Sequence, residues 1–453
     1  MINKLKALNL NFKNIYITPI LVAKVILGQK STGKTSTSIT SKTLFFLRGL
    51  KQYICIKIGI VKNADVLFLT SNHYEVEEKT VVYDKFITPF VQYLQKRNKT
   101  YKIARYTNTF TVAKNYFAGK ELINLQEAGV LAIKLNKAGS DIDVADDNAS
   151  NEFLRLLRET DLSKDVNPLD TTYLLNFLIL KDFFKIYLQK SHTKHIVVVC
   201  YYDLKSFAMV LAANELGVSV IDLQHGVQGI GHFAYNYWPN EIVESSKLFP
   251  THFWCWDEWS AKAIKVWFPQ KENVITGSNV WMKQRIKPEQ KTQILFTAQP
   301  LEDAIPRDII NAVKNYNGKL RWSIRMHPHQ LGEISKYKQL LAEHNILHLV
   351  EFENATNLPL TKILNKSYIH ITNYSSVVLE AMWFGVPSIV ISEQGTQYYR
   401  EQVPEKMLIS AYTATEILDK IEKLEKEWTF NESNTEDKEN FDELANKFFN
   451  YDG

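Results

Sequence analysis

The sequence predicts two doubly wound α/β domains, and three observations support this fold class. The chain has 453 residues, which is longer than a domain with a single hydrophobic core usually is. Its second half alternates short apolar runs with helix-like segments in a regular order. Most of these runs are rich in β-branched residues and end in polar or turn-forming ones. Such alternation is typical of parallel sheets with right-handed crossovers, which bind ligands at the carboxyl ends of their strands.

The first half contains the expected strands of one domain. Five runs rich in β-branched and aromatic residues predict strands at 53–61, 66–70, 101–106, 196–202 and 218–223. Apolar spacing predicts helices at about 171–189 and 205–216, and Gly217 is suited to end the second. Residues 136–170 are polar and acidic, which indicates a surface insertion with one helix.

The second half predicts a second sheet and its helices. Strands are expected at 294–300, 320–329, 347–352, 368–373 and 388–392, and helices at 304–316, 334–345, 357–367, 375–385, 413–428 and 441–451. The polar segment after Gly277 contains Pro288 and reads as a linker. We therefore place an N-terminal domain at 1–285 and a C-terminal domain at 286–428. An acidic segment with a helix, 429–453, could pack back on the first domain.

Composition restricts the partners. A net charge of +5 suits an anionic substrate or a membrane surface and does not call for nucleic acid. Three widely spaced cysteines indicate reduced, buried thiols and a cytoplasmic protein, and no apolar run reaches the roughly 18 residues of a membrane helix. Residues 1–24 are basic and apolar. They either lie on the inner face of a membrane or form a first strand and helix.

A candidate phosphate site lies in the second domain. Arg325 and His327 end one predicted strand, and Ser375 and Ser376, 48 residues after His327, follow a second strand and begin a predicted helix. We expect the two strands to be neighbours in the sheet. Guanidinium, imidazole, hydroxyl and helix amide groups all donate hydrogen bonds to phosphate oxygens. Glu380 lies one turn further along that helix and could accept bonds from ribose hydroxyls. The alternatives are a basic strand end without a ligand and an ordinary pair of capping serines.

A second group of candidates follows strands of the first domain. Gln224 and Gly226 flank His225, which suits a general base on an acceptor hydroxyl or a buried histidine bonded to turn carbonyls. Asp203 could be a base or nucleophile, or the cap of the helix that follows it. Further candidate acceptor contacts are His73, Glu75, His232 and Tyr235.

The order and spacing of His327–Pro328 and Ser375–Ser376 resemble the HP and SS motifs of bacterial GT-B glycosyltransferases that use CMP-activated sugars, the sialyltransferase and Kdo-transferase type. The segments DVLFLTSNHYEV, VYDKFITPFVQYL and IDLQHGVQGIGHFAYNY look like capsule and surface-polysaccharide transferases, so the resemblance covers most of residues 50–425. It implies two Rossmann-like domains facing a central cleft. It also implies a CMP-sugar donor held at the HP and SS motifs, a glycan or glycolipid acceptor, and neither a metal nor another cofactor.

Other interpretations stay open. A CDP-polyol phosphotransferase or a UDP-sugar transferase would keep the fold and change the donor. Residues 28–35 match the phosphate-loop pattern GxxxxGK[ST], which raises an NTPase, although the residues after Thr35 form a poor helix. Asp141 and Asp143 match a metal-binding DxD pattern, but they lie in a polar stretch that reads as loop.

Overall fold

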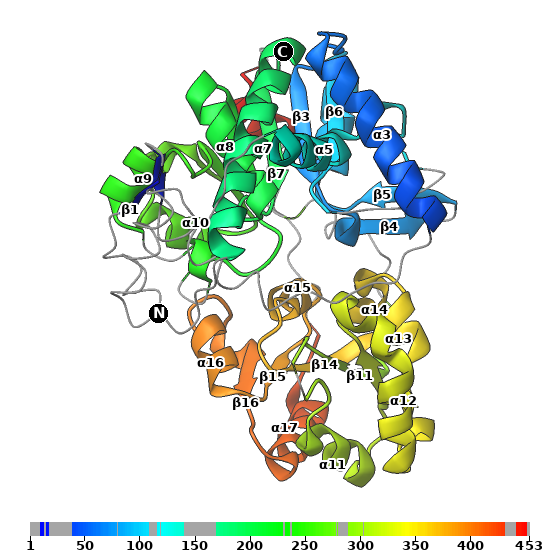
Figure 1. The fold of residues 1–453 in the computed structure, drawn as a ribbon. Coiled ribbons are helices and arrows are strands. Elements are labelled where there is room, and N and C mark those ends of the chain that lie inside the picture. Colours follow the sequence, from blue (N-terminus) through cyan, green and yellow to red (C-terminus); the bar gives the residue numbers. More distant parts are fainter. Residues whose placement is uncertain are drawn as a thin grey trace. The chain divides into compact units, whose positions relative to one another are not determined.

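We describe a computed structural model of the chain (Figure 1). It covers residues 10–12, 15–17, 39–78, 80–107, 116–117, 119–139, 169–229, 232–235, 238–277, 279, 289–301, 303–430 and 441–450. Internal contacts divide the chain into two compact units. The first comprises Met1–Trp281 and Glu439–Gly453, and the second comprises Met282–Lys438.

The first unit contains a parallel six-stranded sheet. Its strands are β3 (Val66–Thr70), β6 (Tyr101–Arg105), β7 (His195–Val199), β8 (Ser219–Leu223), β9 (His252–Cys255) and β10 (Val274–Thr276). They are arranged in the order β10-β9-β8-β7-β3-β6. The chain builds β6 on one side of β3 and the other strands on the opposite side. The strand order therefore reverses between β3 and β7, which makes the ends of these strands the expected ligand crevice.

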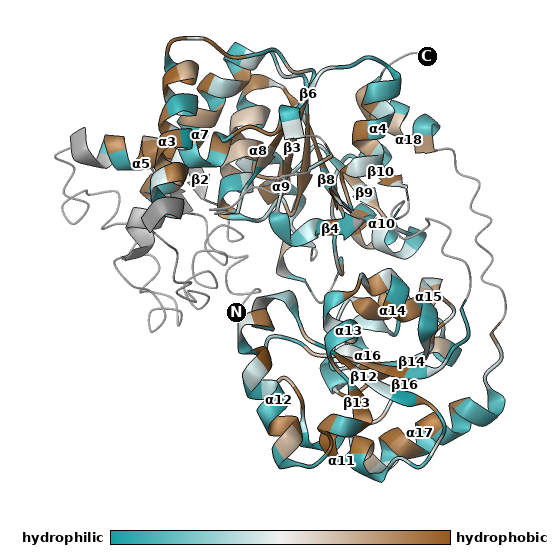
Figure 2. Ribbon diagram, turned by 90° about the vertical axis from the view of Figure 1, so that its right-hand side faces the viewer, coloured by the Kyte–Doolittle hydropathy of each residue, from teal (hydrophilic) through white to brown (hydrophobic). Residues whose placement is uncertain are grey.

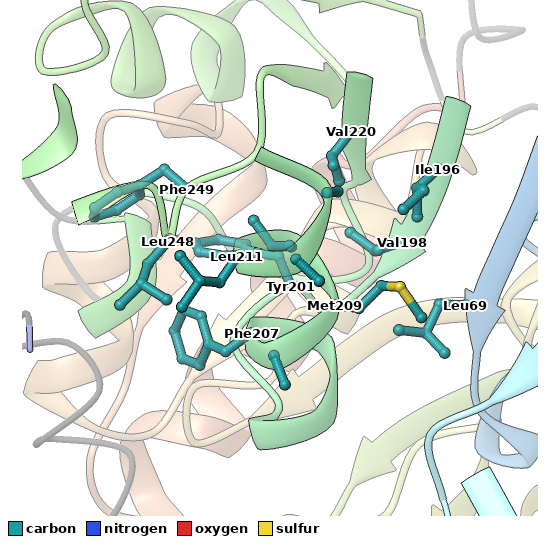
Figure 3. Packing of buried hydrophobic residues seen from close by; sticks show 14 of the residues in the cluster. Leu69, Ile196, Val198, Tyr201, Phe207, Met209, Leu211, Val220, Leu248 and Phe249 are labelled. Atoms are coloured by element: carbon teal, nitrogen blue, oxygen red, sulfur yellow. The ribbon is translucent and has the colours of Figure 1, made fainter. Parts of the chain in front are cut away.

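Helices cover this sheet in sequence. Helix α3 (Ile39–Lys57) packs on α5 (Leu125–Gly139), α5 packs on α7 (Leu169–Ser191), and α7 packs on α8 (Leu204–Leu216) (Figure 1). Helix α8 is central to the core, where Phe207, Met209 and Leu211 lie among strand residues such as Ile196 and Val198 (Figure 3). Because α8 is buried along most of its length, its sequence is apolar on nearly every face.

The C-terminal helix belongs to the first unit. Helix α18 (Phe441–Phe449) lies beside α4 (Thr88–Lys96), as Figure 2 shows. Phe449 stacks on Tyr93, and the Tyr93 hydroxyl donates to Asn446 Oδ1. Phe448 covers the rings of His195 and His252. The last residues of the chain therefore complete the core of its first domain.

Most of the expected elements of the first unit are present, with one clear error. The predicted strand at 66–70 is β3, and Gly217 ends α8 with a left-handed φ of 70°. The predicted strand at 53–61 is wrong, because residues up to Lys57 continue α3. That run is apolar and β-branched, and such short runs do not distinguish a strand from a packed helix.

The second unit contains a second parallel six-stranded sheet. Its strands are β11 (Gln293–Thr297), β12 (Arg321–Arg325), β13 (Val350–Glu351), β14 (Ser367–Thr372), β15 (Ser388–Val390) and β16 (Leu408–Ser410). They are arranged in the order β13-β12-β11-β14-β15-β16. We expected β12 and β14 to be neighbours. This is wrong, because β11 lies between them, and the order reverses between β11 and β14.

Alternating residues of β11 supply both faces of this sheet. Ile294 and Phe296 join the cluster that contains residues of α11 (Arg307–Asn315), α12 (Ile334–Glu343) and α17 (Ala414–Glu427). Leu295 points to the other face, against residues of α14 (Leu360–Lys366) and α15 (Val377–Trp383). This period of two places helices on both faces, as a doubly wound sheet requires.

Shorter elements complete the described parts. They are β1 (Leu10–Phe12), β2 (Ile15–Ile17), β4 (Glu75–Glu78), β5 (Val81–Asp84), α9 (Asn240–Ser246), α10 (Glu258–Lys265), α13 (Glu353–Asn357) and α16 (Glu393–Tyr399). The two sheets confirm the predicted fold class, two doubly wound Rossmann-like domains. Within the described ranges, every helix is too short or too polar to cross a bilayer.

A buried histidine joins three strands of the second sheet. His370 of β14 is fully buried. Its Nε2 lies 2.8 Å from Thr297 Oγ1 on β11, and its Nδ1 lies 2.9 Å from Ser388 Oγ on β15. Burial lowers the pKa of His370 to about 3, because a charged imidazolium is poorly solvated there.

This histidine should make the second unit sensitive to acid. The unfolded chain binds the proton at a pKa near 6.5, whereas the folded unit does not until about pH 3. The contribution of neutral His370 to the free energy of unfolding is therefore fully present above about pH 6.5. It decreases as the pH falls, by about 2–3 kcal/mol at pH 4.5. Urea unfolding at about pH 6.5 and about pH 4.5 should find this loss of unfolding free energy in the native protein and a smaller loss in His370→Gln. An equal loss in both proteins would contradict the assignment.

Candidate functional site

The end of β12 carries the first predicted group of the second unit. Arg325 Nη1 donates to the carbonyl oxygens of Ala355, at 2.6 Å, and Leu358, at 2.7 Å. Both acceptors lie at the carboxyl end of α13 and just beyond it. The guanidinium therefore connects β12 to this helix through Nη1 alone. Its other N–H groups point in different directions, because the guanidinium is a planar fork of five donors.

Arg325 also links the two predicted clusters electrostatically. Burial lowers the pKa of Arg325, and the negative charge of Glu380 opposes that shift. Glu380 is only 5% exposed and projects from α15, which follows β14. A buried carboxylate needs a cation or hydrogen-bond donors to offset its lost hydration. The positive charge of Arg325, at the end of β12, is therefore within electrostatic reach of Glu380 on α15.

The two serines before α15 have different environments. Ser375 Oγ accepts a hydrogen bond of 3.3 Å from the backbone N–H of Val377, and its carbonyl accepts one from Val378. Ser376 is the N-cap residue by position, but its side chain makes no capping bond. Ser375 thus acts as a helix cap, which was the alternative interpretation, while the Ser376 hydroxyl remains available for another partner.

His327 lies two residues after the end of β12 and is half-buried. Its carbonyl accepts a 2.8 Å bond from the N–H of Gln330, which closes a turn. The turn belongs to a short 3-10 helix at Pro328–Glu333. Strand β12 already ends at Arg325, two residues before His327, which differs from the predicted strand at 320–329, and Pro328 begins the 3-10 helix.

Two residues of this site were not singled out from the sequence. Gln299 follows β11, and its Oε1 accepts a 2.7 Å bond from the N–H of Tyr374, which joins the two loops on either side of the switch point. Asn373 directly follows β14 and is 8% exposed, and its Nδ2 has no hydrogen-bond partner. A buried amide donor without a partner is costly, so Asn373 is well placed to bind a ligand. Their position after the two switch strands is the signal that could have found them.

In the first unit, His225 lies at the carboxyl end of β8 beside two tyrosines. Its Nε2 is 2.9 Å from the hydroxyl of Tyr202, and its Nδ1 is 3.4 Å from the carbonyl of Leu223. Its ring lies 5.8 Å from that of Tyr74, which follows β3. A carbonyl only accepts, so the contact with Leu223 favours the tautomer that carries its proton on Nδ1, with Nε2 accepting from Tyr202. This tautomer leaves Nε2 basic, as a general base requires.

The neighbours of His225 serve the local backbone. Gln224 is buried, and its Nε2 donates to Gly226 O at 2.9 Å and to Ser260 Oγ at 3.0 Å. Its Oε1 accepts from the N–H of Trp256. The amide of Gln224 is therefore engaged inside the protein, where it fixes the loop that carries His225. Gly226 lies in a bend, whereas the left-handed φ of this segment, 107°, belongs to Gly229.

His232 and Tyr235 lie in the same aromatic cluster. The ring of His232 is 4.8 Å from that of Tyr202 and 5.1 Å from that of Tyr235. Tyr235 is buried and donates to Asp222 Oδ2 at 2.6 Å. Burial raises the pKa of Asp222 to about 7, against the hydrogen bonds that it receives from Tyr235 and the backbone.

Asp222 also holds the turn after β7. Its Oδ1 accepts a 3.0 Å bond from the N–H of Tyr201. The residue before Tyr201, Cys200, has a left-handed φ of 73°, which is unusual for a residue with a side chain. The carboxylate therefore stabilises a strained turn at the switch point of the first sheet, a role that requires three-dimensional proximity and leaves no mark in the sequence.

Asp203 is the N-cap of α8. Its side chain accepts a 3.0 Å bond from the N–H of Lys205, which matches the capping interpretation. Lys205 itself is turned toward β6, where its ammonium donates to the carbonyl of Tyr106 at 2.6 Å. Asp203 still follows the carboxyl end of β7, and in the sequence it comes directly after Tyr202 of the aromatic cluster.

The two remaining candidates lie after β3. His73 is exposed within a 3-10 turn, and its N–H bonds to Ser71 Oγ at 3.2 Å. Glu75 forms an ion pair with the buried Arg105, and burial raises the pKa of Glu75 against the effect of that arginine. The charge of Glu75 is thus balanced by Arg105 inside the protein, whereas the side chain of His73 is exposed to solvent.

Several sequence motifs fall outside the described residues. These are the phosphate-loop match at 28–35, the Asp141 and Asp143 pair, and most of the acidic insertion at 136–170. Among the residues that are described, no group of three or more His, Cys, Asp or Glu side chains is arranged to hold a metal ion. The cysteines at 55, 200 and 255 are free thiols.

Comparisons with known proteins concern the fold. No family model and no curated protein matches this sequence. Similar solved structures include a putative UDP-N-acetylglucosamine 2-epimerase from Listeria monocytogenes, with 12% identity, 86% of this chain and 91% of that chain covered, and a TM-score of 0.46. A UDP-GlcNAc 2-epimerase from Methanocaldococcus jannaschii, in complex with UDP-GlcNAc and UDP, has 11% identity, coverage of 80% and 93%, and a TM-score of 0.47.

A lipopolysaccharide outer core galactosyltransferase has 10% identity, coverage of 84% and 94%, and a TM-score of 0.44. Identities this low, with TM-scores below 0.5, say nothing about substrate. The chemistry of this chain therefore has to be argued from its own residues.

Proposed function

We propose that the protein is a glycosyltransferase that transfers an acidic sugar, of the Kdo or sialic type, from its CMP-activated form to a glycan or lipid-linked acceptor. The donor nucleotide would bind to the second unit at the switch point between β11 and β14. The first unit would bind the acceptor. Peripheral association with a membrane and independence of metal ions are parts of the same proposal.

The observation that carries the donor site is the unpartnered amide of Asn373 beside the uncommitted hydroxyl of Ser376. Both lie at the end of β14, where ligands bind in doubly wound sheets. His327 lies at the end of β12, two strands away, and adds an imidazole. Three donors of this kind could meet the charge of a monophosphate, the leaving group of a CMP-sugar.

Glu380 provides the acceptor for the other end of the nucleotide. Its buried carboxylate interacts electrostatically with Arg325, and carboxylate oxygens accept hydrogen bonds from ribose hydroxyls. Arg325 is partly engaged by the carbonyls of Ala355 and Leu358, so we assign it the positioning of Glu380 and of the β12 loop. In this proposal the phosphate is contacted directly by Asn373, Ser376 and His327.

The proposed transfer balances with one proton movement. His225 Nε2 takes the proton of the acceptor hydroxyl while the acceptor oxygen bonds to the anomeric carbon of the sugar. The bond between that carbon and the phosphate oxygen breaks, and CMP leaves with its electron pair. The Tyr202 hydroxyl at 2.9 Å holds the imidazole in place before the reaction. Asp203, as a helix cap, is the weaker candidate for base.

Calorimetric titration with CMP tests the donor site. CMP should bind to the native protein, and Ser376→Ala and Asn373→Ala should each weaken it about 5- to 30-fold, as expected when a ligand loses a charge-assisted bond of about 1–2 kcal/mol. His327→Ala should behave similarly. The matched control is Arg321→Ala, which removes an exposed basic side chain from the opposite end of the same strand. Unchanged binding in all three site variants would overturn the assignment.

A nucleotide panel separates the runner-up interpretations. Stabilisation by UDP and not by CMP would favour a UDP-sugar transferase, because a ligand raises the melting temperature only of a state that binds it. Preference for CDP-linked donors would favour a polyol phosphotransferase. Magnesium-dependent ATP hydrolysis that is lost in Lys34→Ala would favour the NTPase.

A further inference from the structure

We propose that the exposed face of helix α3 docks the first unit on an anionic lipid bilayer. Most amphipathic helices in globular proteins turn their apolar stripe toward the core. In α3 and the turn after it, several large apolar side chains are exposed instead. They are Leu44 (51%), Phe46 (47%), Leu47 (53%), Ile54 (46%), Ile58 (62%) and Ile60 (68%). Figure 2 shows the apolar character of this helix in brown.

These residues form a continuous stripe. Leu44, Leu47, Lys51, Ile54 and Ile58 are spaced by three and four residues, which places them on one face of a helix. The helical hydrogen bonding extends past the last residue of α3, because the N–H of Ile58 donates to Ile54 O at 2.9 Å. Ile58 therefore stays on the same face as Ile54, and the stripe runs for about four turns.

The opposite face of α3 is fixed to the protein. Gly49 and Ile56 are buried there, seven residues apart. A Cβ atom at Gly49 would lie 2.7 Å from the backbone oxygen of Glu127, so the glycine permits close contact between α3 and α5. Tyr53 stacks on Phe183 of α7 at 5.9 Å. The helix cannot rotate to bury its apolar stripe without losing this packing.

The charge of the sequence segment that contains α3 identifies the partner. Residues 1–64 contain eleven Lys and Arg and no Asp or Glu, although the whole chain has 54 basic and 49 acidic residues. The basic excess of the chain is thus concentrated in this segment, and the remainder is net acidic. Lys42, Lys51 and Lys57 of α3 and Lys62 after it are exposed. An apolar stripe flanked by lysines suits an interface of acyl chains and anionic headgroups.

A second copy of this chain would be a poor partner for the same face. Two such segments would bring together their basic residues, with no acidic side chain to balance them. An anionic bilayer, in contrast, is complementary to both the charge and the apolar stripe. The inference concerns the first unit alone and does not depend on which nucleotide the second unit binds.

Vesicle flotation tests the proposal with the full-length protein. The native protein should float with vesicles that contain 30 mol% phosphatidylglycerol in phosphatidylcholine, and much less with pure phosphatidylcholine. Leu47→Asn/Ile54→Asn should reduce the bound fraction at least about tenfold, because two apolar side chains no longer enter the interface. Lys51→Gln should reduce it about fivefold. Raising the salt to 0.5 M should weaken binding of the native protein.

Matched controls come from the second unit. Leu331→Asn/Leu349→Asn removes two apolar side chains of similar exposure, 46% and 40%, and Lys319→Gln removes an exposed lysine. Neither control should alter flotation. Because all the replaced side chains are exposed, melting temperatures and CMP titration should be unchanged, which separates failure here from failure of the donor site.

Two results would overturn the proposal. The first is that the native protein fails to float with anionic vesicles. The second is that the α3 variants and the second-unit controls reduce flotation equally. If analytical ultracentrifugation finds a dimer that Leu47→Asn/Ile54→Asn converts to a monomer, without any vesicle binding, the face joins two copies and the lipid assignment is likewise overturned.

Discussion

Replacing Arg325 with alanine is expected to destabilise the second unit by about 3 kcal/mol, the largest stability effect of any substitution considered. The change removes two hydrogen bonds to the carbonyls of Ala355 and Leu358 and a positive charge that interacts electrostatically with the buried carboxylate of Glu380. Native-state hydrogen exchange of amides in β12 and α15 should report the loss, because exchange measures the free energy of opening in each region.

A double-mutant cycle isolates the contribution of Glu380. Glu380→Gln in the Arg325→Ala background should recover about 1–2 kcal/mol, because a neutral amide is less costly to bury than a carboxylate that has lost a nearby positive charge. The same substitution in the native protein should be destabilising. Strictly additive effects would mean that the two side chains are not coupled, and the link between the β12 and β14 ends would then have to be abandoned.

Replacing His225 with alanine is expected to reduce turnover by about 10²–10⁴-fold, the usual contribution of a general base. The measurement is CMP release from CMP-N-acetylneuraminic acid or CMP-Kdo in the presence of a glycan acceptor. CMP affinity should stay the same, because His225 belongs to the first unit and the donor site to the second. Turnover within twofold of the native protein would eliminate His225 as the base.

Two further variants distinguish the roles near His225. Tyr202→Phe removes the hydroxyl that lies 2.9 Å from Nε2 and should slow turnover about tenfold, with the base still present. Asp203→Asn keeps an oxygen that can accept from the N–H of Lys205, so the cap of α8 is preserved. A large loss of turnover in Asp203→Asn without loss of stability would transfer the catalytic role to Asp203.

The sequence predicts the fold well where local signals agree with tertiary structure. Strand β3 is buried on all five residues, and its predicted and observed bounds coincide. Gly217 and the capping box at Thr413 and Glu416 have the caps that their residue types favour. At residues 53–57 the local sequence signal and the tertiary structure disagree. Their β-branched side chains favour a strand, but packing through Gly49 against α5 makes them helical, and no local pattern encodes that contact.

The site is predicted less completely, because its geometry depends on strand order. The sequence places Arg325 and Ser376 after strands, but it cannot tell that β11 separates those strands and forms one wall of the switch point. Gln299 and Asn373 were therefore overlooked. The internal bonds of Gln224 and the ion pair of Glu75 with Arg105 likewise join residues far apart in the chain. Polar residues at strand ends are easily found from sequence, but their partners are not.

The position of α18 has a consequence for biosynthesis. The aromatic side chains of α4 are covered by residues that are synthesised much later, such as Asn446, which is 353 positions after its partner Tyr93. The amino-terminal domain is therefore translated long before its final helix exists, and the whole second domain is made in between. A nascent chain would hold Phe90 and Tyr93 uncovered during that interval, which makes them natural targets for a chaperone.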